Sequence, residues 1–509
     1  MDRLTALLSS LALLAGLFVY APQSVRALEP VYIGPAGGSG ECASPLYDTD
    51  GGADDEQFQT AVDAQDGDID NILYVCPGTY DIDAEIVVVG SLTIEGVSGA
   101  AATVLDASGT GYSILEADSD LIIRGLTFKD GTATNGGAIN VQGDLTVENS
   151  AFTNNDASED GGAIYIEGAL DLVANSTFTG NVAGDDGGAI HVDDDIYDVD
   201  ADGETGLINN VFTGNISEDD GGAIYVDNQV VGSLISGNIF SSNEADEDGG
   251  AIYVNDEFND SVLSSNSFEG NLSGEDGGAF WLNDDFENGS QIIDNTFTNN
   301  TSADDGGAVM IYYDMDEGTL ISGNTFTGNQ GVTGEGGGLQ IDENAAGTIS
   351  KNVFVGNENE EGGGLYIGDL HDSAVITMNT FRNNIATDQG GGAWIDDEGG
   401  ESSELAIFTK NSFRGNRAEN DGGALYLDFA SSELTPRFFT RNMFRSNRAA
   451  VGGAIAFKGL GSDAVDCSSP LTSSRAAARI FKKNRFASNR ATGSRRSANV
   501  GLMPCVLAP

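Results

Sequence analysis

Short apolar segments in which every second residue is hydrophobic recur along most of the chain, between turns rich in Asn, Gly and Asp. Two of them are residues 223–226 and 233–236. A period of two is typical of β-strands, and no segment of the repeated region has the period and length of a helix. Because so small a pair of strands cannot bury a face alone, the pattern predicts strands that stack on copies of themselves.

Two half-motifs alternate at a usual spacing of 27 to 29 residues. One is Gly-Gly-Ala-Ile or a close variant, from Gly136 to Gly452. The other is Phe-x-x-Asn, usually with another Asn two residues before the Phe. Its Phe residues are Phe152, Phe178, Phe212, Phe240, Phe268, Phe297, Phe326, Phe354, Phe381, Phe413, Phe444 and Phe486. Self-similarity at such a period is the signature of a solenoid.

One repeat per coil predicts an all-β fold, a right-handed parallel β-helix (solenoid) of about 14 coils. With strands about 4.8 Å apart, the rod would be roughly 70 Å long. The Phe side chains would form an internal stack, and the Asn side chains a ladder at a turn. The Gly-Gly pair would permit a backbone approach that a side chain forbids.

The ends of the rod need caps, because open sheet edges invite association. Residues 56–64 predict a short amphipathic helix over the N-terminal end. We expect disulfides between Cys42 and Cys76 and between Cys467 and Cys505, since an even number of cysteines in an exported chain favours pairing. The expected domains are an N-terminal cap at 28–85, the β-helix repeats at 86–460, and a last coil with a basic C-terminal cap at 461–509.

The first 27 residues resemble a secretory signal peptide. Arg3 precedes an apolar run over residues 4–19, and residues 25–27 supply a small-x-small cleavage site. The alternative is an uncleaved membrane anchor, but the run is shorter than the ~20 residues of a spanning helix. We expect an export signal and no membrane span, and therefore a secreted or cell-surface protein.

Acidic residues outnumber basic ones 80 to 22, for a net charge of −58. This excludes nucleic acid as a partner, because binding phosphates needs a basic surface. The charge changes sign near the C-terminus, where residues 410–509 carry sixteen Lys or Arg against six Asp or Glu. This basic end predicts a peripheral contact with an anionic envelope or head-to-tail association, and the alternative is a solubilising cap.

The alternating half-motifs resemble the polymorphic outer membrane protein repeats of chlamydial surface proteins, over about residues 128 to 489. The resemblance implies a right-handed β-helix on the cell surface, with adhesion as the usual role. Those proteins end in an autotransporter barrel, whereas only twenty residues follow Asn489 here. Self-translocation and anchoring by a barrel are therefore not expected to carry over.

The acidic residues are patterned, with one set directly before the Gly-Gly pairs. Stacked coils would place their charges about 5 Å apart, at a cost unless cations screen or bridge them. Calcium bound between coils is one interpretation, and a solvated acidic face is the other. No cofactor other than calcium is indicated. The candidate calcium ligands are Asp186, Asp220, Asp248, Asp276 and Asp305.

Strand parity predicts a stripe of aromatic side chains. In Gly-Gly-Ala-Ile-Tyr-Val the Ile and Val point inward, so the residue between them points outward. We expect an exposed stripe suited to sugar rings or protein contacts, and the alternative is packing that only stabilises the sheet. Its members are Tyr165, Tyr225, Tyr253, Trp281, Tyr366, Trp394 and Tyr426.

Catalysis has weaker support in the sequence. A polysaccharide lyase needs cationic groups, yet no Lys or Arg lies between Lys129 and Lys351. A glycoside hydrolase needs two placed carboxylates, and here no pair stands out from the background. His191 and His371 lie in different coils and are expected on the surface. We therefore expect a non-catalytic adhesin or binding rod for a cell-surface glycan or protein. The alternatives are a polysaccharide hydrolase or lyase, and a structural envelope component.

Overall fold

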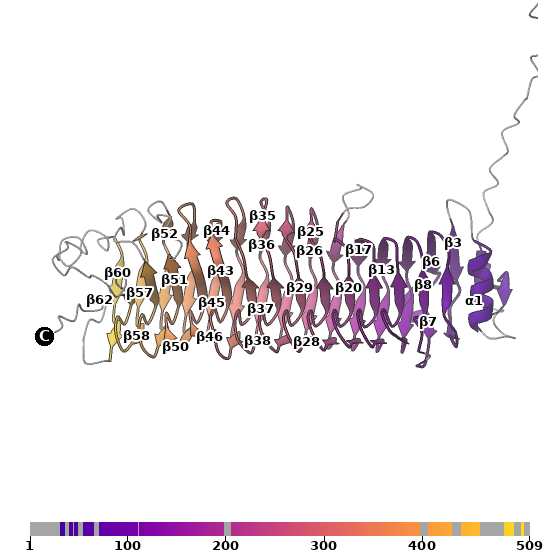
Figure 1. Ribbon diagram of the computed structural model, residues 1–509, viewed down its shortest axis with the longest axis horizontal. Helices are drawn as coiled ribbons and strands as arrows, with labels where there is room; N and C mark the ends of the chain where they lie inside the picture. Colours follow the sequence, from indigo (N-terminus) through magenta and orange to yellow (C-terminus); the bar gives the residue numbers. More distant parts are fainter. Residues whose placement is uncertain are drawn as a thin grey trace, which may run out of the picture.

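The structure, a computed structural model, describes residues 31–35, 40–43, 45–48, 54–65, 71–109, 111–197, 205–397, 406–429, 439–458, 483–492 and 500–502. They form a rod of stacked coils, with α1 (Asp54–Asp63) at one end and the last coils at the other (Figure 1). Four parallel sheets of 16, 15, 15 and 13 strands run along the rod. The predicted all-β parallel β-helix is confirmed.

Each regular coil contains four short strands, twice the number that the sequence predicted. The additional strands hold the Phe of Phe-x-x-Asn and the two residues after its Asn. In one coil these four strands are β24 (Ile224–Val226), β26 (Leu234–Ser236), β27 (Ile239–Ser241) and β28 (Glu244–Ala245), and this coil has a further short strand, β25 (Val230–Val231). They pair in parallel with β29 (Ile252–Val254), β31 (Val262–Ser264), β32 (Ser267–Glu269) and β33 (Leu272–Ser273) of the next coil.

The Phe residues form the predicted internal stack, the phenylalanine ladder, which runs from Phe128 to Phe486. Successive rings are nearly parallel, at 2–11°, with centroids 4.5–5.1 Å apart. All but Phe486 are fully buried. Each coil of the ladder buries one phenylalanine ring against the ring of the next coil. This repeated burial of apolar area stabilises the stacking of the coils along the rod.

The Asn side chains form two buried asparagine ladders, one before and one after the Phe. Asn271 shows the geometry: its Nδ2 donates to the Phe240 carbonyl at 3.1 Å and to Asn300 Oδ1 at 3.0 Å. Asn300 Oδ1 also accepts the Asn271 backbone N–H at 3.0 Å. Each amide therefore satisfies turn groups that would otherwise be buried without partners.

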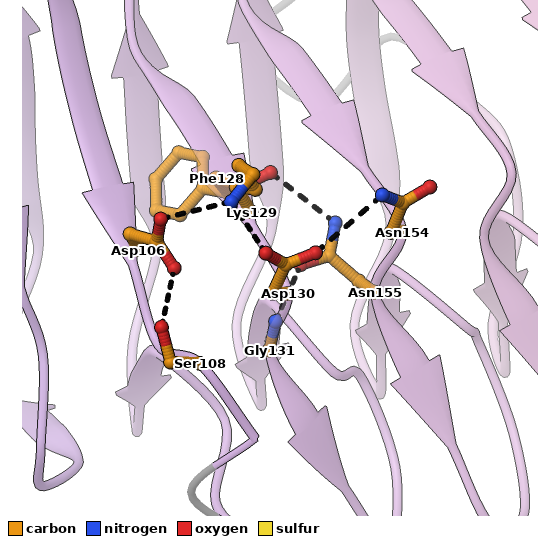
Figure 2. Close-up of polar contacts among 8 residues, drawn as sticks. All are labelled: Asp106, Ser108, Phe128, Lys129, Asp130, Gly131, Asn154 and Asn155. Carbon is orange, nitrogen blue, oxygen red and sulfur yellow. Dashed lines mark hydrogen bonds and ion pairs between the residues drawn. The ribbon is translucent and has the colours of Figure 1, made fainter.

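The start of the second asparagine ladder is visible in Figure 2, where Asn155 Nδ2 donates to the Phe128 carbonyl at 3.3 Å. Beside it, the Lys129 ammonium lies between the carboxylates of Asp106 and Asp130. Hydrogen bonds to these two acids, that to Asp130 first, hold the pKa of Lys129 above its usual value. The charge of this lysine is therefore already neutralised within the rod.

The N-terminal end is capped as predicted. Helix α1 buries Phe58, Ala61 and Val62 against the first coils, and the Cys42–Cys76 disulfide is present. The expected signal peptide and the Cys467–Cys505 pair lie outside the described residues, and the domain boundaries stay predictions. No helix in the described part of the chain has the length and apolar character that crossing a membrane requires.

Candidate functional site

The aromatic stripe lies in the predicted register. Each of its residues is the second residue of a strand: β16 (Ile164–Ile166), β24, β29, β34 (Phe280–Leu282), β47 (Leu365–Leu370), β51 (Ala393–Asp397) and β55 (Leu425–Phe429). The strand β20 (Ile190–Val192) between β16 and β24 carries His191 at the same position. Tyr225 pairs with Tyr253, and Tyr253 with Trp281. Further along the rod, Tyr366, Trp394 and Tyr426 are in register as well.

The expected exposure of the stripe is wrong. Five of its seven members are buried and the other two, Tyr165 and Tyr366, are half-buried. The backbone of the Gly-Gly turn folds across this face: a Cβ on Gly249 would lie 3.0 Å from Tyr253 Cβ. Strand parity gives the direction of a side chain but not what covers it. Most of the stripe forms two small buried clusters rather than an open platform for sugar rings.

The five candidate calcium ligands lie in one row, which we call the acid ladder. One carboxylate oxygen of each accepts the backbone N–H of the acidic residue one coil further on, and Glu335 closes the row after Asp305. The distances along the row are 2.9, 2.8, 2.8, 2.7 and 2.6 Å. The ladder therefore aligns the turns that cover the aromatic stripe.

Burial is the largest cause of raised pKa values in the acid ladder, and neighbouring carboxylates add to it. The amide hydrogen bonds act in the opposite direction. The pKa values rise to about 7 for Asp186, 6 for Asp220, 8 for Asp248, 6 for Asp276 and 8 for Asp305. Calcium binding by these residues stays a prediction, and protonation near neutral pH would compete with it.

One carboxyl pair stands out from the ladder. Burial is the largest cause of the raised pKa values of both Asp305 and Glu335. A side-chain hydrogen bond between them, which requires one carboxyl to be protonated, raises the pKa of Asp305 further and opposes the rise for Glu335. A glycosidase needs its two carboxyl groups about 5 to 9.5 Å apart to place a sugar or water between them. A direct hydrogen bond is shorter than that, so this pair does not have the geometry of a hydrolase.

Six of the exposed arginines on the C-terminal coils lie in two rows, which together we call the arginine edge. One row, on β49 (Thr380–Arg382), β53 (Ser412–Arg414) and β57 (Met443–Arg445), is in register across three coils. The second, on β54 (Arg417–Ala418), β58 (Arg448–Ala449) and β61 (Arg490–Ala491), lies one turn further along the chain and is shifted by one coil, so the two rows share two coils and together span four. The members are Arg382, Arg414, Arg445, Arg417, Arg448 and Arg490.

Little in the described part of the chain neutralises the arginine edge. Among the described residues, only Arg417 of the arginine edge has a carboxylate within ion-pair distance, that of Glu419 at 3.5 Å, and both side chains are exposed. Like charges about 5 Å apart repel by about 1 kcal/mol in water. The sequence shows the basic end, but only the register shows that its arginines line up in two rows.

The two histidines differ from their expected surface placement. His371 is half-buried, and its Nδ1 contacts Ser373 Oγ at 2.8 Å. His191 occupies a stripe position on β20 and is only 6% exposed. The expectation was wrong for His191 because the Gly-Gly turn covers this face, as it does for the tyrosines beside it.

The comparisons with known proteins agree with this architecture. Residues 245–417 match the family described as right handed beta helix region, which supports the right-handed sense. Residues 149–167, 175–193 and 211–227 match the Chlamydia polymorphic membrane protein repeat, which confirms the expected resemblance in these segments. The chain is thus a right-handed parallel β-helix with polymorphic membrane protein repeats. No curated protein is significantly similar to it in sequence.

Solved structures similar to this chain are polysaccharide lyases with low sequence identity. A mannuronic acid specific family 6 lyase from human gut microbiota is 14% identical, covers 85% of this chain and 89% of its own, and has a TM-score of 0.43. An alginate lyase, AlyF-OU02, is 16% identical over 80% and 84%, with a TM-score of 0.36. A family 6 lyase from Pseudopedobacter saltans is 14% identical over 92% and 94%, with a TM-score of 0.31. Similarities this distant carry no argument about activity.

Proposed function

We propose that the protein is an exported, non-catalytic β-helix rod that binds an acidic polysaccharide at the cell surface through its arginine edge. The observation that carries this proposal is the pair of in-register arginine rows, six exposed guanidinium groups over four coils. A surface location is supported by the polymorphic membrane protein repeat.

The geometry of the rows favours a linear polyanion. Neighbouring coils repeat about every 4.8 Å along the axis, so each row presents one positive charge per coil. Guanidinium groups form paired hydrogen bonds with carboxylates and sulfates. A polymer with an acidic group on successive sugars would replace repulsion between arginines with attraction to the ligand.

The charge of the rest of the chain restricts where a polyanion can bind. Residues 1–409 carry six basic against seventy-four acidic residues, so most of the rod repels a polyanion. Binding is therefore confined to the basic end, and the acidic part of the rod points away from the anionic surface. A polymer bound along the rows would run parallel to the axis of the rod.

The test is co-sedimentation with polygalacturonate, neutral dextran and anionic phosphatidylglycerol vesicles at low and high salt. The wild-type protein should bind polygalacturonate, lose it as salt rises, and leave dextran in solution. The variant Arg414→Gln/Arg445→Gln/Arg448→Gln should bind about tenfold more weakly, since three exposed contacts contribute roughly 0.5 kcal/mol each.

The matched control removes three exposed cations outside the edge, Lys351→Gln/Lys410→Gln/Lys483→Gln, and should bind like the wild type. Equal loss in both variants would show a response to net charge alone and overturn the assignment of the edge. Binding to vesicles without binding to polygalacturonate would identify a membrane surface and overturn the polysaccharide.

A further inference from the structure

His191 is an exception within the aromatic stripe. It lies on β20 between Tyr165 of β16 and Tyr225 of β24, and its ring stacks on theirs with centroid distances of 5.1 and 4.8 Å. An aromatic ring of any kind would serve this packing. The imidazole adds two nitrogens to a position that its neighbours fill with tyrosine.

The Nδ1 atom of His191 is buried and has no hydrogen-bond partner. It faces Asp160 Oδ1 at 3.7 Å, which is too long for a hydrogen bond. Buried polar atoms without partners are rare in folded proteins because desolvation without a bond costs about 1–3 kcal/mol. An unpartnered nitrogen at this place therefore points to a ligand.

Two carboxylates complete the group. Ligand atoms of Asp160, Asp186 and His191 all lie within 4.8 Å of one another. Asp160 Oδ1 accepts the Asp186 N–H at 3.4 Å, and Asp186 Oδ1 accepts the Asp220 N–H at 2.9 Å. A carboxylate has about four acceptor positions on two oxygens, so these bonds leave capacity for a cation. The backbone bonds also fix the orientation of both side chains.

The electrostatics of the group favour a bound cation. Asp160 and Asp186 place two carboxylates beside the buried imidazole of His191. No Lys or Arg occurs from residue 130 to 350 to balance these acids.

We propose that His191 Nδ1, Asp160 and Asp186 bind one divalent transition-metal ion of the zinc class. One imidazole with two carboxylates suits zinc and its neighbours, whereas calcium takes six to eight oxygen ligands. Ligands at about 2.1 Å from a tetrahedral ion lie about 3.4 Å apart, so the ligand atoms, now within 4.8 Å of one another, need to approach by up to about 1.4 Å. Three protein ligands leave a fourth position open.

This metal site is independent of the arginine edge, which lies many coils away along the chain. It also differs from the expected calcium ladder, because it uses the one coil with a histidine at the stripe position. The neighbouring coils place tyrosine here and are not expected to bind the same ion.

The test is a titration of the chelator-treated protein with Zn²⁺ by calorimetry, in millimolar Ca²⁺ and Mg²⁺ that occupy nonspecific acidic sites. We expect one tight equivalent, and with Co²⁺ an absorption spectrum of a four-coordinate ion. His191→Tyr keeps the repeat's own aromatic residue and therefore the fold, and should abolish this equivalent. Asp186→Asn should weaken it at least tenfold.

The matched control is His371→Gln, which removes the only other histidine and should bind like the wild type. Circular dichroism and melting of each variant establish that it is folded. No tight equivalent in the wild type, or equal binding by His191→Tyr, would overturn the proposal.

Discussion

Asp248 offers the sharpest test of how the acid ladder is built. Its Oδ1 accepts the Asp276 N–H at 2.8 Å, and its own N–H donates to Asp220 Oδ1 at 2.8 Å. Asp248→Asn keeps an oxygen for the Asp276 amide and removes the ionisable group. Since the carboxylate is the form that burial opposes, we expect the substitution to stabilise the rod at alkaline pH.

The direction of this stability change follows from the linkage between protonation and folding. The fold raises the pKa of Asp248 from 3.8 to about 8, so its contribution to stability is fully present below about pH 4 and is lost as pH rises to about 8. A shift of about four units sets an upper bound of about 6 kcal/mol. The side chain is only half-buried and neighbouring acids compete for protons, so we expect a gain of about 2 kcal/mol at about pH 8.5.

The assay is urea unfolding of the wild type and Asp248→Asn in chelator at about pH 8.5 and about pH 4. The gain should vanish at the acidic pH, where both side chains are neutral. The control Asp246→Asn removes a charge from an exposed position of the same turn and should change stability by less than about 0.5 kcal/mol. Destabilisation by Asp248→Asn at pH 8.5 would refute the reasoning, because it would mean that the charged hydrogen bond outweighs burial.

Two further sets of substitutions test what stabilises the rod, namely the asparagine ladder and the N-terminal disulfide. Asn271→Ala should destabilise it by about 2–4 kcal/mol in urea unfolding, because the Asn243 N–H and Nδ2 lose their acceptor. The exposed Asn420→Ala is its control, and equal effects of the two would contradict a role for the ladder. Removing the 34-residue crosslink by Cys42→Ser/Cys76→Ser should cost about 2–4 kcal/mol and raise amide exchange in α1. Unchanged protection of α1 would show that the helix caps the rod without the disulfide.

The fold was predictable because its determinants repeat in the sequence. The spacing of Phe268 and Asn271 recurs in the other repeats. The physical argument for a Phe stack and an Asn ladder in one coil therefore applies to every coil with this spacing. The capping helix was predictable from a local amphipathic segment between Cys42 and Cys76. The four-strand coil was not, since strands such as Glu244–Ala245 are too short to show alternation.

The surfaces were predictable only in part. Strand parity correctly predicted that Tyr253 and Trp281 lie in one row. Their burial, however, depends on the path of the Gly-Gly turn, where Gly249 has a φ of +65°, and the alternation of apolar residues does not predict that path. The equivalent Gly-Gly turns of the earlier coils bury His191 and bring Asp160 and Asp186, which belong to two neighbouring coils, close to it. The rows of the arginine edge needed the register between Arg414 and Arg445.

The most direct measurement is whether bound polysaccharide is cleaved. Wild-type protein would be incubated with polygalacturonate at low salt, with and without Ca²⁺ and Zn²⁺. Bound protein, new reducing ends and unsaturated ends would be scored in the same tubes. A non-catalytic binding rod predicts protein in the pellet and no new chain ends under any condition. New chain ends that increase with time and protein concentration would contradict this account and identify an enzyme.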